Sequence, residues 1–508
     1  MKICSIGSIN WDINTFCKGW LITGATGAGK TISGIGVLLH QVFINCSGAE
    51  KGYPKWGGVC IDEKGSYAAT LRSMTEHYGR KEDLKILSIS ENAEDLPPVR
   101  LNLIGDLTVR PKTYAEALVK ASEAVNGGAK NSDTFFRDKT IFCIALAIEL
   151  IFEIYKERND KGLRECRIGL DRVGAMLSSK EGFQHFLKVE GLIRTINTPI
   201  PSEQDECLAD ESFKSPSGEI VFEEITDPVI KSKRIDCLLE EFENKMWCQP
   251  GDQLGGVLGT IANCLSHFSA DPIINAFCRD STFNFSDIDQ GKIVCVSIPQ
   301  SFSVERRYIS ATLKFLFYNH ALRRFDYDEN TLIKKNLLIL WQDEGQRFFS
   351  EDDCNTDVIR QARATTVIAT QSTTSLYAQL NNEKKTDATI LNLRNRIIFQ
   401  SSDATCAEVS SRFLGEKRTK NRTQSIGPGG KSTSISTTNS PAVSTAKLRG
   451  LKPHCAYISP GNNSAPRHYI IEPLDVNGDV PSWWPKFLLK KYPFRWIVRV
   501  FLGRRGAL

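Results

Sequence analysis

A glycine-rich stretch near the start of the chain constrains its fold more than any other feature. Residues 24–31 read GATGAGKT and match the phosphate-binding P-loop at each fixed position. The apolar residues 19–23 before it predict a short buried strand, and residues 31–40 after it predict an apolar helix. Because a P-loop connects a strand to a helix, the sequence predicts an α/β fold with a parallel sheet. A glycine-rich turn with an exposed lysine, the alternative, would leave both flanking patterns as coincidence.

The residue types of this loop predict a site for a nucleoside triphosphate. Glycines allow successive backbone N–H groups to point at a polyphosphate, beside the positive end of a helix dipole. Lys30 would reach the β- and γ-phosphates, and the hydroxyl of Thr31 would bind Mg²⁺. We therefore expect ATP and Mg²⁺ as cofactors. The expected binding residues are Gly24, Ala25, Thr26, Gly27, Ala28, Gly29, Lys30 and Thr31.

The composition excludes several other classes of protein. Hydrophobic residues make up 41% and charged residues 24% of the 508 residues, which is ordinary for a soluble globular protein and not for a disordered or fibrous one. The net charge of +5 is too small over this length to indicate a nucleic-acid partner by itself. The 15 cysteines include no C-x-x-C pair and no Cys/His ligand spacing, which argues against disulfides and zinc and indicates a reducing cytoplasm.

The sequence predicts neither a signal peptide nor a membrane span. The first residues lack the apolar core and cleavage site of a secretory signal. The longest apolar stretch, residues 141–154, is interrupted by Glu149 and Glu153 and falls short of the roughly 20 residues that a spanning helix needs. We expect a buried helix there, and a cytoplasmic protein.

Strand and helix patterns divide the chain into parts. Apolar strand patterns at 57–62, 84–88, 292–298, 336–344, 364–372 and 395–400 alternate with helix patterns at 66–78, 307–323 and 404–414, as in a parallel α/β layer. Between them lie the helix patterns 114–126, 134–155, 177–192 and 235–246, with a loop at 199–227 that could hold a hairpin at 219–224. We expect an α/β domain in two parts, residues 1–112 and 285–475, a mainly helical insertion at 113–284, and a tail at 476–508.

Two strands of the second part end in side chains suited to hydrolysis. Asp343 ends a buried strand and can hold the Mg²⁺ shell, while Glu344 can orient and deprotonate an attacking water. The next strand finishes in Gln371, which we expect to sense the γ-phosphate. Hydrophobic strands that end in polar residues are also common structural features, so the catalytic interpretation depends on the P-loop beside them.

Two later segments are basic. Residues 417–444 are rich in Ser, Thr, Gly and basic side chains, which predicts a flexible loop or an extended hairpin. Its basic residues are Lys417, Arg418, Lys420, Arg422 and Lys431. A nucleic-acid contact and a solvated linker are equally open interpretations of residues 417–444.

Residues 483–508 mix aromatic and basic side chains with no acid. This composition suits an anionic membrane surface, a nucleic acid or a partner subunit, or a tail packed on its own domain.

Taken in order, these motifs resemble the conjugative coupling-protein family, the DNA-transfer ATPases of type IV secretion. The family's second strand ends in Asp-x-Lys-Gly, matched by Asp62, Lys64 and Gly65, and its later motifs are matched by Asp343-Glu344, Gln371-Ser372 and Leu414-Gly415. Phe135-Phe136-Arg137 resembles the residues that open a core helix of the family's all-α domain. The resemblance covers roughly residues 18 to 475 and implies a RecA-like P-loop NTPase with a mainly parallel central sheet and an inserted all-α domain.

The resemblance also implies partners and an assembly. It implies an ATP-hydrolysing motor, with Walker A and Walker B motifs, that works as a homo-oligomer, a hexameric ring, and moves DNA with help from other secretion or relaxosome proteins. In such rings a neighbouring subunit often supplies an arginine for the transition state, and we favour Arg363 among Arg360, Arg363, Arg394 and Arg396. Family members usually carry N-terminal transmembrane helices, whereas about twenty residues precede the P-loop strand here. We therefore expect no transmembrane anchor, and at most a peripheral contact of the tail with the inner face of the cell membrane.

Two other functions remain open from the sequence. One is a double-stranded DNA translocase or secretion ATPase of the FtsK and HerA type, which DNA-stimulated ATP hydrolysis would separate from a protein exporter. The other is a nucleotide-dependent assembly protein with little turnover. Lys30, Thr31, Asp343 and Glu344 argue against a dead enzyme but do not measure turnover.

Overall fold

The computed structural model of the chain has two compact units. It describes residues 2–48, 54–63, 65, 67–90, 92, 95–125, 134–163, 166–192, 232–380, 382–427, 430–462 and 464–491. One unit, here called the sheet unit, consists of Met1–Leu101, Lys120–Asn131 and Asp280–Leu508. The other, the helical unit, consists of Asn102–Val119 and Ser132–Arg279.

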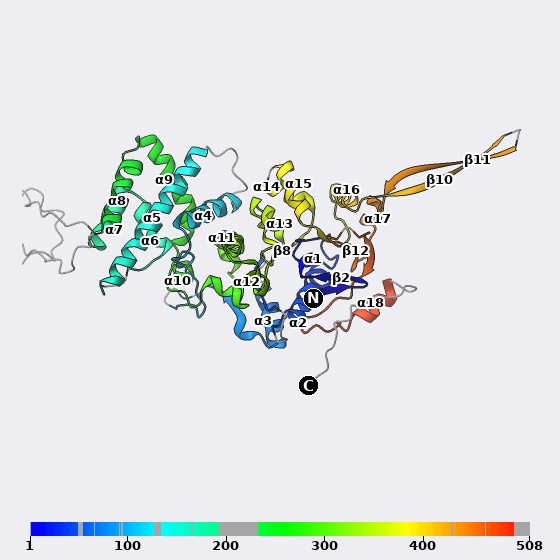
Figure 1. Cartoon of the computed structure of the whole chain (residues 1–508), viewed down its shortest axis with the longest axis horizontal. Coiled ribbons are helices and arrows are strands. Elements are labelled where there is room, and N and C mark those ends of the chain that lie inside the picture. Colours follow the sequence, from blue (N-terminus) through cyan, green and yellow to red (C-terminus); the bar gives the residue numbers. More distant parts are fainter. Residues whose placement is uncertain are drawn as a thin grey trace, which may run out of the picture. The chain divides into compact units, whose positions relative to one another are not determined.

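The sheet unit is built on a nine-stranded sheet in the order β13-β12-β9-β3-β8-β7-β4-β6-β5. Figure 1 labels two of these strands, β8 and β12. The strands are β3 (Trp20–Thr23), β4 (Trp56–Asp62), β5 (Leu84–Leu87), β6 (Ile293–Val296), β7 (Leu337–Asp343), β8 (Ala364–Thr370), β9 (Asn395–Ile398), β12 (Cys455–Ser459) and β13 (Arg467–Ile470). The seven strands from β9 to β5 are parallel, and β12 is antiparallel to both β9 and β13. The prediction of an α/β fold with a mainly parallel central sheet is confirmed.

The helices of this unit join and cover the strands. They are α1 (Ile13–Phe16), α2 (Gly36–Asn45), α3 (Tyr67–His77), α11 (Ser303–Arg323), α12 (Glu329–Lys334), α13 (Thr356–Ile359), α14 (Thr373–Leu380), α15 (Glu383–Asn392), α16 (Ala404–Phe413), α17 (Thr445–Arg449) and α18 (Trp484–Lys491). Two antiparallel pairs stand apart from the large sheet: β1 (Lys2–Ile6) with β2 (Ile9–Asp12), and β10 (Glu416–Gly427) with β11 (Gly430–Pro441). The segment at 417–444 is therefore an extended hairpin followed by a short turn, not an irregular loop.

The core lies on both faces of the sheet. Successive side chains of a strand point to opposite faces, so neighbouring residues of β3 enter different clusters. Trp20 and Ile22 pack in a large cluster with Leu38 of α2, whereas Leu21 packs in a second cluster with Leu376 of α14. Burial on both faces explains why these strands read as continuous apolar runs in the sequence.

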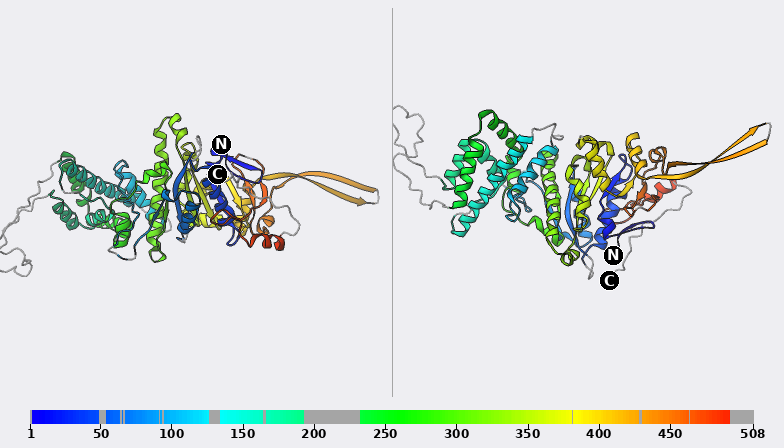
Figure 2. Two further views of the ribbon diagram at one scale, coloured as in Figure 1. Left: turned by 90° about the horizontal axis from the view of Figure 1, so that it is seen from below. Right: turned by 45° about the horizontal axis from the view of Figure 1, so that its top comes forward.

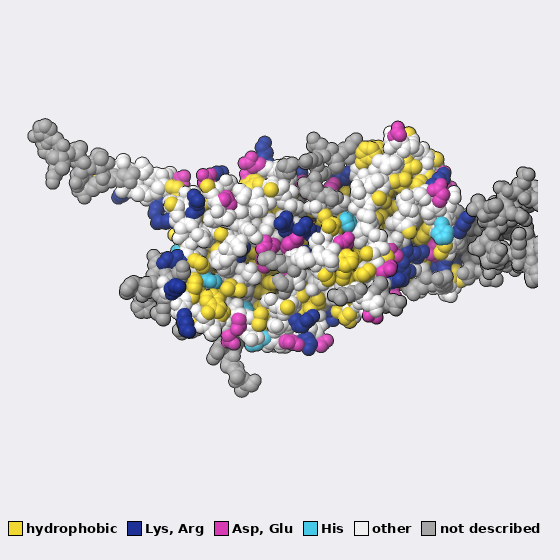
Figure 3. Space-filling model, turned by 180° about the vertical axis from the view of Figure 1, so that it is seen from behind, with side chains coloured by type: hydrophobic (Ala, Val, Ile, Leu, Met, Phe, Trp, Pro, Cys, Tyr) yellow, Lys and Arg dark blue, Asp and Glu magenta, His cyan; other side chains and the backbone are white. Residues whose placement is uncertain are grey.

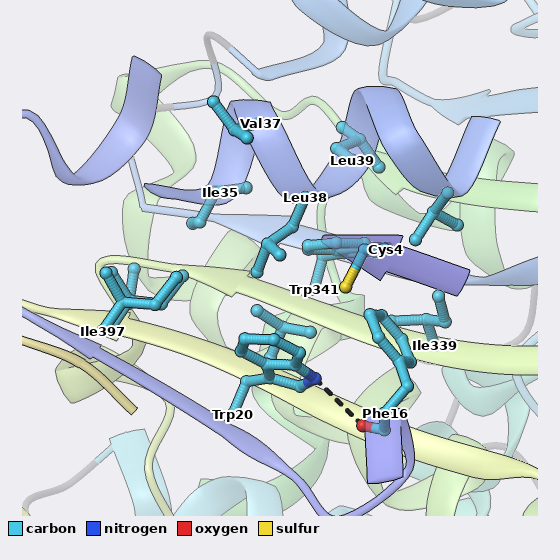
Figure 4. Packing of buried hydrophobic residues seen from close by; sticks show 14 of the residues in the cluster. Cys4, Phe16, Trp20, Ile35, Val37, Leu38, Leu39, Ile339, Trp341 and Ile397 are labelled. Atoms are coloured by element: carbon cyan, nitrogen blue, oxygen red, sulfur yellow. Dashed lines mark hydrogen bonds between the residues drawn. The ribbon is translucent and has the colours of Figure 1, made fainter. Parts of the chain in front are cut away.

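Close packing fixes the strand before the P-loop. Figure 4 shows Leu38 of α2 directed at the sheet, over the strand that carries Trp20. The indole Nε1 of Trp20 donates a hydrogen bond to the carbonyl oxygen of Phe16 over 2.9 Å, so the one polar group of this buried side chain has a partner. The strand therefore holds the start of the P-loop on a rigid base.

The regular secondary structure among the described residues of the helical unit is helical. The helices are α5 (Thr134–Asp160), α6 (Leu170–Leu177), α7 (Lys180–Val189), α8 (Lys233–Phe242), α9 (Gly251–Leu265) and α10 (Asp271–Phe277), and α4 (Pro111–Val125) begins in this unit. The apolar stretch 141–154 is a largely buried part of α5, as predicted. Among the described residues, no helix combines the length and the apolar character needed to cross a bilayer.

One predicted helix was wrong. Residues 177–192 were expected to form a single helix, but α6 ends at Leu177 and α7 begins at Lys180. Ser179 interrupts them because its Oγ accepts a hydrogen bond from the backbone N–H of Gly182 over 3.0 Å, which caps the start of a new helix. The hairpin expected at 219–224 lies outside the described residues.

Candidate nucleotide site at the carboxyl edge of the sheet

Four adjacent parallel strands bring the predicted site residues to one edge of the sheet. In the register, Thr23 of β3 is paired with Thr370 of β8, and Asp62 of β4 is paired with Asp343 of β7. Strands β7 and β8 are neighbours, so all four strands end at the same edge. The P-loop follows β3, Gln371 follows β8, and the two aspartates end β4 and β7. Ligands of open parallel sheets bind at this edge.

Hydrogen bonds to the ends of neighbouring strands fix the start of the P-loop backbone, and two glycines with positive φ allow it to turn. The N–H of Ala25 donates to the carbonyl of Gln400 over 2.7 Å, and the N–H of Gly24 donates to the carbonyl of Thr370 over 3.3 Å. Gly27 and Gly29 then take φ values of +78° and +104°, in the region that favours glycine. These two positions explain why the motif needs glycine there.

Lys30 lies inside the loop that it belongs to. Its ammonium donates to the carbonyl oxygens of Gly24 over 2.6 Å and Ala25 over 3.1 Å. It also begins a π-helical turn, Lys30–Ile35, which precedes α2. Thr31 is exposed on the first turn, so its hydroxyl is open to solvent beside the loop.

Glu344 sits on a strained turn and is held by two amides. It takes a φ of +53°, which is uncommon for a residue with a side chain. Its carboxylate accepts hydrogen bonds from Nε2 of Gln346 over 2.7 Å and from Nε2 of Gln371 over 3.0 Å. Its backbone N–H donates to Oδ1 of Asp343 over 3.0 Å. The Asp-Glu pair and the predicted sensor glutamine thus form one connected group.

Asp62 adds a second carboxylate next to Asp343. It is buried, and its Oδ2 accepts a hydrogen bond from the N–H of Tyr67 over 3.1 Å, at the start of α3. Burial raises the pKa of the Tyr67 hydroxyl well above its usual value, and the nearby carboxylates add to this shift. Gly65 of the Asp-x-Lys-Gly match has a φ of +69°, while Lys64 lies outside the described residues.

These side chains fit a magnesium nucleotide. Mg²⁺ prefers oxygen ligands, and the edge offers the hydroxyl of Thr31 and the carboxylate of Asp343. Within the described ranges there is no cluster of three or more His, Cys, Asp or Glu side chains of the kind that cages a metal without a nucleotide. The residues therefore suit an ion that arrives with phosphate oxygens.

The structure does not bring Arg363 to this edge. Arg363 precedes β8, at the opposite end of the strand, with a φ of +54°. Its guanidinium donates to the backbone carbonyls of Ile333 and, over 3.0 Å, Lys335. Its role in a neighbouring subunit's site stays a prediction.

The other candidate arginines differ in exposure. Arg396 is buried, donates to the carbonyl of Ile390 over 2.7 Å, and lies 3.6 Å from the ring centroid of Phe413. Burial lowers the pKa of this guanidinium to about 9. Arg394 is exposed and Arg360 is half-buried. Arg396 is thus engaged within its own unit, and Arg394 is the candidate most open to a neighbour.

His454, which no sequence pattern indicated, contacts the P-loop and the helical turn that follows it. Its Nδ1 forms a hydrogen bond of 2.8 Å with the hydroxyl of Ser33, and its backbone N–H donates to the carbonyl of Ala28 over 2.9 Å. The ring centroid lies 5.1 Å from that of Trp484 and 5.3 Å from that of Phe487. Burial lowers the pKa of His454 to about 4, so the ring is neutral at neutral pH. A lone histidine 421 positions from its partner has no pattern that a single sequence could reveal.

Part of the C-terminal tail packs on its own unit. Trp484 is 1% exposed and belongs to a cluster with Leu488 and Leu448. Its Nε1 donates to Glu472 over 3.1 Å. Trp484 is therefore not available to a membrane, and at this residue the structure agrees with the interpretation of a tail packed on its own domain. The aromatic residues Tyr492, Phe494, Trp496 and Phe501 lie outside the described residues.

Comparisons with known proteins agree with this architecture. Residues 338–453 match the family described as the TraM recognition site of TraD and TraG. The unbound form of the bacterial conjugative coupling protein TrwBdeltaN70 is similar along 95% of this chain and 91% of its own, with 14% identity and a TM-score of 0.61. The fold is that of a conjugative coupling protein. The predicted resemblance is confirmed at this level. No curated protein sequence matches the chain.

Two further coupling-protein structures hold nucleotides. The plasmid coupling protein TrwB in complex with the non-hydrolysable ATP analogue ADPNP is 14% identical, covers 95% of this chain and 92% of its own, and has a TM-score of 0.60. TrwB in complex with ADP and Mg²⁺ is also 14% identical, covers 93% and 89%, and has a TM-score of 0.56. The segment that matches the family model contains Asp343, Glu344 and Gln371 together with the β10–β11 hairpin, and it ends one residue before His454.

Proposed function

We propose that this chain is an ATP-hydrolysing motor that binds and translocates DNA, or DNA with attached protein, in conjugation or type IV secretion. The observation that carries the proposal is the meeting of a P-loop, the Asp343-Glu344 pair and Gln371 at one edge of a sheet with the coupling-protein fold. The nucleotide complexes of TrwB, whose fold this chain shares, support nucleotide binding here.

The P-loop holds the nucleotide. The N–H groups of Gly24, Ala25 and Ala28 donate to backbone carbonyls, so other N–H groups of the loop would face the β- and γ-phosphates. The ammonium of Lys30 would exchange its loop carbonyls for phosphate oxygens. The hydroxyl of Thr31 and the carboxylate of Asp343 would hold Mg²⁺. When bound, the ion neutralises charge that develops on the phosphate oxygens.

Glu344 acts on the attacking water. Its carboxylate takes a proton as the water oxygen bonds to the γ-phosphorus and the bond to the ADP oxygen breaks. Gln371 and Gln346 keep the carboxylate in place through their amide groups. Gln371 follows β8, the strand next to the P-loop strand β3. Its amide can give up its hydrogen bond to Glu344 and donate to a γ-phosphate oxygen instead, so its position would differ between bound ATP and bound ADP.

The assembly, the partners and the location follow from the same proposal. We expect a homo-oligomer, a hexameric ring, in which one subunit supplies Arg363 or another arginine to its neighbour's site. A relaxosome protein of the TraM kind is the partner that the matched family description suggests. The motor would work in the cytoplasm at the inner face of the cell membrane.

ATP hydrolysis with and without DNA tests the proposal. The rate should rise on adding DNA and should be lost in Lys30→Ala, whose affinity for ATP should fall about 10- to 100-fold because a charge-assisted contact disappears. Lys81→Ala is the matched control, since the Lys81 side chain is 68% exposed and pairs with Glu76, which is itself 51% exposed. Hydrolysis without any response to single- or double-stranded DNA would favour a protein exporter, and nucleotide binding without turnover would favour an assembly protein.

A further inference from the structure

The β10–β11 hairpin is a long ribbon that takes no part in the nucleotide site. Its two twelve-residue strands pair in continuous register from Glu416 and Pro441 to Gly427 and Gly430. At about 3.4 Å per residue the ribbon is roughly 40 Å long. Figure 1 and Figure 2 show it extending away from the rest of the sheet unit. An isolated two-stranded ribbon is marginally stable in water, so a protruding one calls for a partner.

The register sorts the ribbon's charges by face. Directly paired residues share a face, and successive residues alternate between faces. Arg418 is paired with Asn439 and Lys420 with Thr437, so both cations share one face with these polar side chains. Lys417, paired with Ser440, lies on the other face. The described side chains at these positions are exposed, apart from Ser440, which is half-buried.

The charge of the ribbon is concentrated, and its one acid, Glu416, lies at the start of the face that bears Arg418 and Lys420. Residues 416–441 contain five basic residues and one acid, while the whole chain has a net charge of only +5. Neither Arg418 nor Lys420 pairs with an acid among the described residues. On the face of the molecule that Figure 3 draws, Lys and Arg side chains lie next to Asp and Glu. A face with a net positive charge attracts a polyanion.

We propose that the ribbon face bearing Arg418 and Lys420 binds the phosphate backbone of duplex DNA. This inference rests on the proposed function and adds the surface through which the DNA is held. The major groove, about 12 Å wide, admits a two-stranded ribbon. The ribbon is also about as long as one turn of duplex, roughly 34–36 Å.

The chemistry of the face argues against other partners. A membrane surface would require apolar and aromatic anchors, and the described part of the ribbon offers only Ile435, which is 67% exposed. A second copy of the same ribbon would bring like charges together, which disfavours pairing of these faces.

The test measures binding of the full chain to a labelled 30-base-pair duplex over a series of salt concentrations. Arg418→Gln/Lys420→Gln should weaken binding at least tenfold at low salt and reduce the slope of log affinity against log salt by about two, because each lost phosphate contact removes about 0.9. Arg418→Lys/Lys420→Arg keeps the charges and should keep the slope. Lys417→Gln on the other face is the matched control and should change the slope by less than half as much as Lys420→Gln.

Each other outcome contradicts the inference in a distinct way. Equal effects of Lys417→Gln and Lys420→Gln would mean that net charge, not this face, matters. If Arg418→Gln/Lys420→Gln weakened binding to a single strand of the same sequence but not to the duplex, duplex DNA would be excluded as the partner of this face. If the double variant formed a smaller particle than the parent in light scattering and kept the parent's DNA affinity, the ribbon would be a contact between subunits and not a DNA-binding surface. ATP hydrolysis by the unsubstituted chain, with Lys30→Ala as the blank, tests the proposed function separately. If the ribbon variants bind DNA normally, the inference about the ribbon fails, but the unsubstituted chain can still hydrolyse ATP.

Discussion

Gln371 donates a hydrogen bond to the Glu344 carboxylate over 3.0 Å, and this contact joins the ends of the neighbouring strands β8 and β7. Glu344 also accepts from Gln346 over 2.7 Å and stands on a backbone with a φ of +53°. Strained backbone of this kind persists only where surrounding contacts hold it. The carboxylate is thus positioned by the protein itself, at the end of β7, and β8 separates that strand from β3, which leads into the P-loop.

Glu344→Gln should retain ATP and lose hydrolysis. Glutamine keeps the shape and an acceptor oxygen for Gln371, but it cannot take the proton of the attacking water. Loss of a general base lowers kcat by about 10²- to 10⁴-fold. Single-turnover hydrolysis and the Kd of a fluorescent ATP analogue measure the two effects separately. Hydrolysis at the parental rate would remove Glu344 from the mechanism.

Gln371→Ala should lower kcat about tenfold with little change in the Kd for ATP. The variant removes one hydrogen bond to a charged group, worth about 1.5 kcal/mol or more, and a loss of that size in the transition state is roughly tenfold in rate. Gln361→Ala is the control, since Gln361 is exposed and precedes β8 at the opposite edge. If both variants lose the same activity, the loss reports general damage and not the contact with Glu344.

Alanine substitutions at Gly27 and Gly29 of the P-loop should separate the cost of backbone strain from the cost of a steric clash. Gly27 and Gly29 both have positive φ, so either substitution costs about 1–3 kcal/mol of backbone strain. A Cβ at Gly29 would lie 2.8 Å from Nδ1 of His454, whereas a Cβ at Gly27 meets nothing within 4 Å. Gly29→Ala should therefore destabilise the chain more than Gly27→Ala in denaturant unfolding without nucleotide. The reverse order would mean that His454 moves away at little cost.

The sequence predicts local elements well where one physical pattern dominates. The P-loop, the strand that ends at Asp343 and the strand that ends before Gln371 carry apolar runs with polar ends, and they meet at one edge because parallel strands must end together. The strand order and the second face of the core depend on pairing between distant residues. No local pattern reports that, so the antiparallel strands β12 and β13 were not predicted.

The candidate site shows the same division. Lys30, Asp343 and Glu344 belong to motifs with fixed spacing, so the sequence points to them. His454 reaches Ser33 only because β12 pairs with β9 at the far side of β3. Lys314 and Asp353 form a buried pair of 2.5 Å that no charge pattern along the chain distinguishes from a surface pair.

Lys314→Met should be among the most destabilising substitutions of the sheet unit. Lys314 is 1% exposed and Asp353 is fully buried, and Asp353 also accepts from the Tyr318 hydroxyl over 2.8 Å. Removing one partner of such a pair leaves a buried charge and costs about 3–5 kcal/mol.

Lys385→Met is the matched control for this pair. Lys385 and Glu351 are also 2.5 Å apart but are 55% and 64% exposed, so their pair contributes about 0–1 kcal/mol. Urea unfolding of the full chain compares the two variants. Equal shifts of the midpoint would contradict the distinction between the buried and the exposed pair.

His454 should make the sheet unit sensitive to acid. Its pKa is about 4 in the folded chain and 6.5 in a model peptide, because burial against Trp484 and Phe487 disfavours the charged ring. Above pH 6.5 both states are neutral and its contribution to stability is complete. Between pH 6.5 and 4 the unfolded chain takes up a proton that the folded chain does not, so up to about 3 kcal/mol of the free energy of unfolding is lost across this window.

The variant His454→Asn tests this loss. Asparagine tolerates the observed φ of +63° but does not titrate in this pH range. The Tm of the parent should therefore fall more steeply than that of His454→Asn between pH 6.5 and 4, while His185→Asn, at an exposed position, should follow the parent. Parallel Tm curves for all three proteins would mean that His454 is charged, or solvated, in the folded chain.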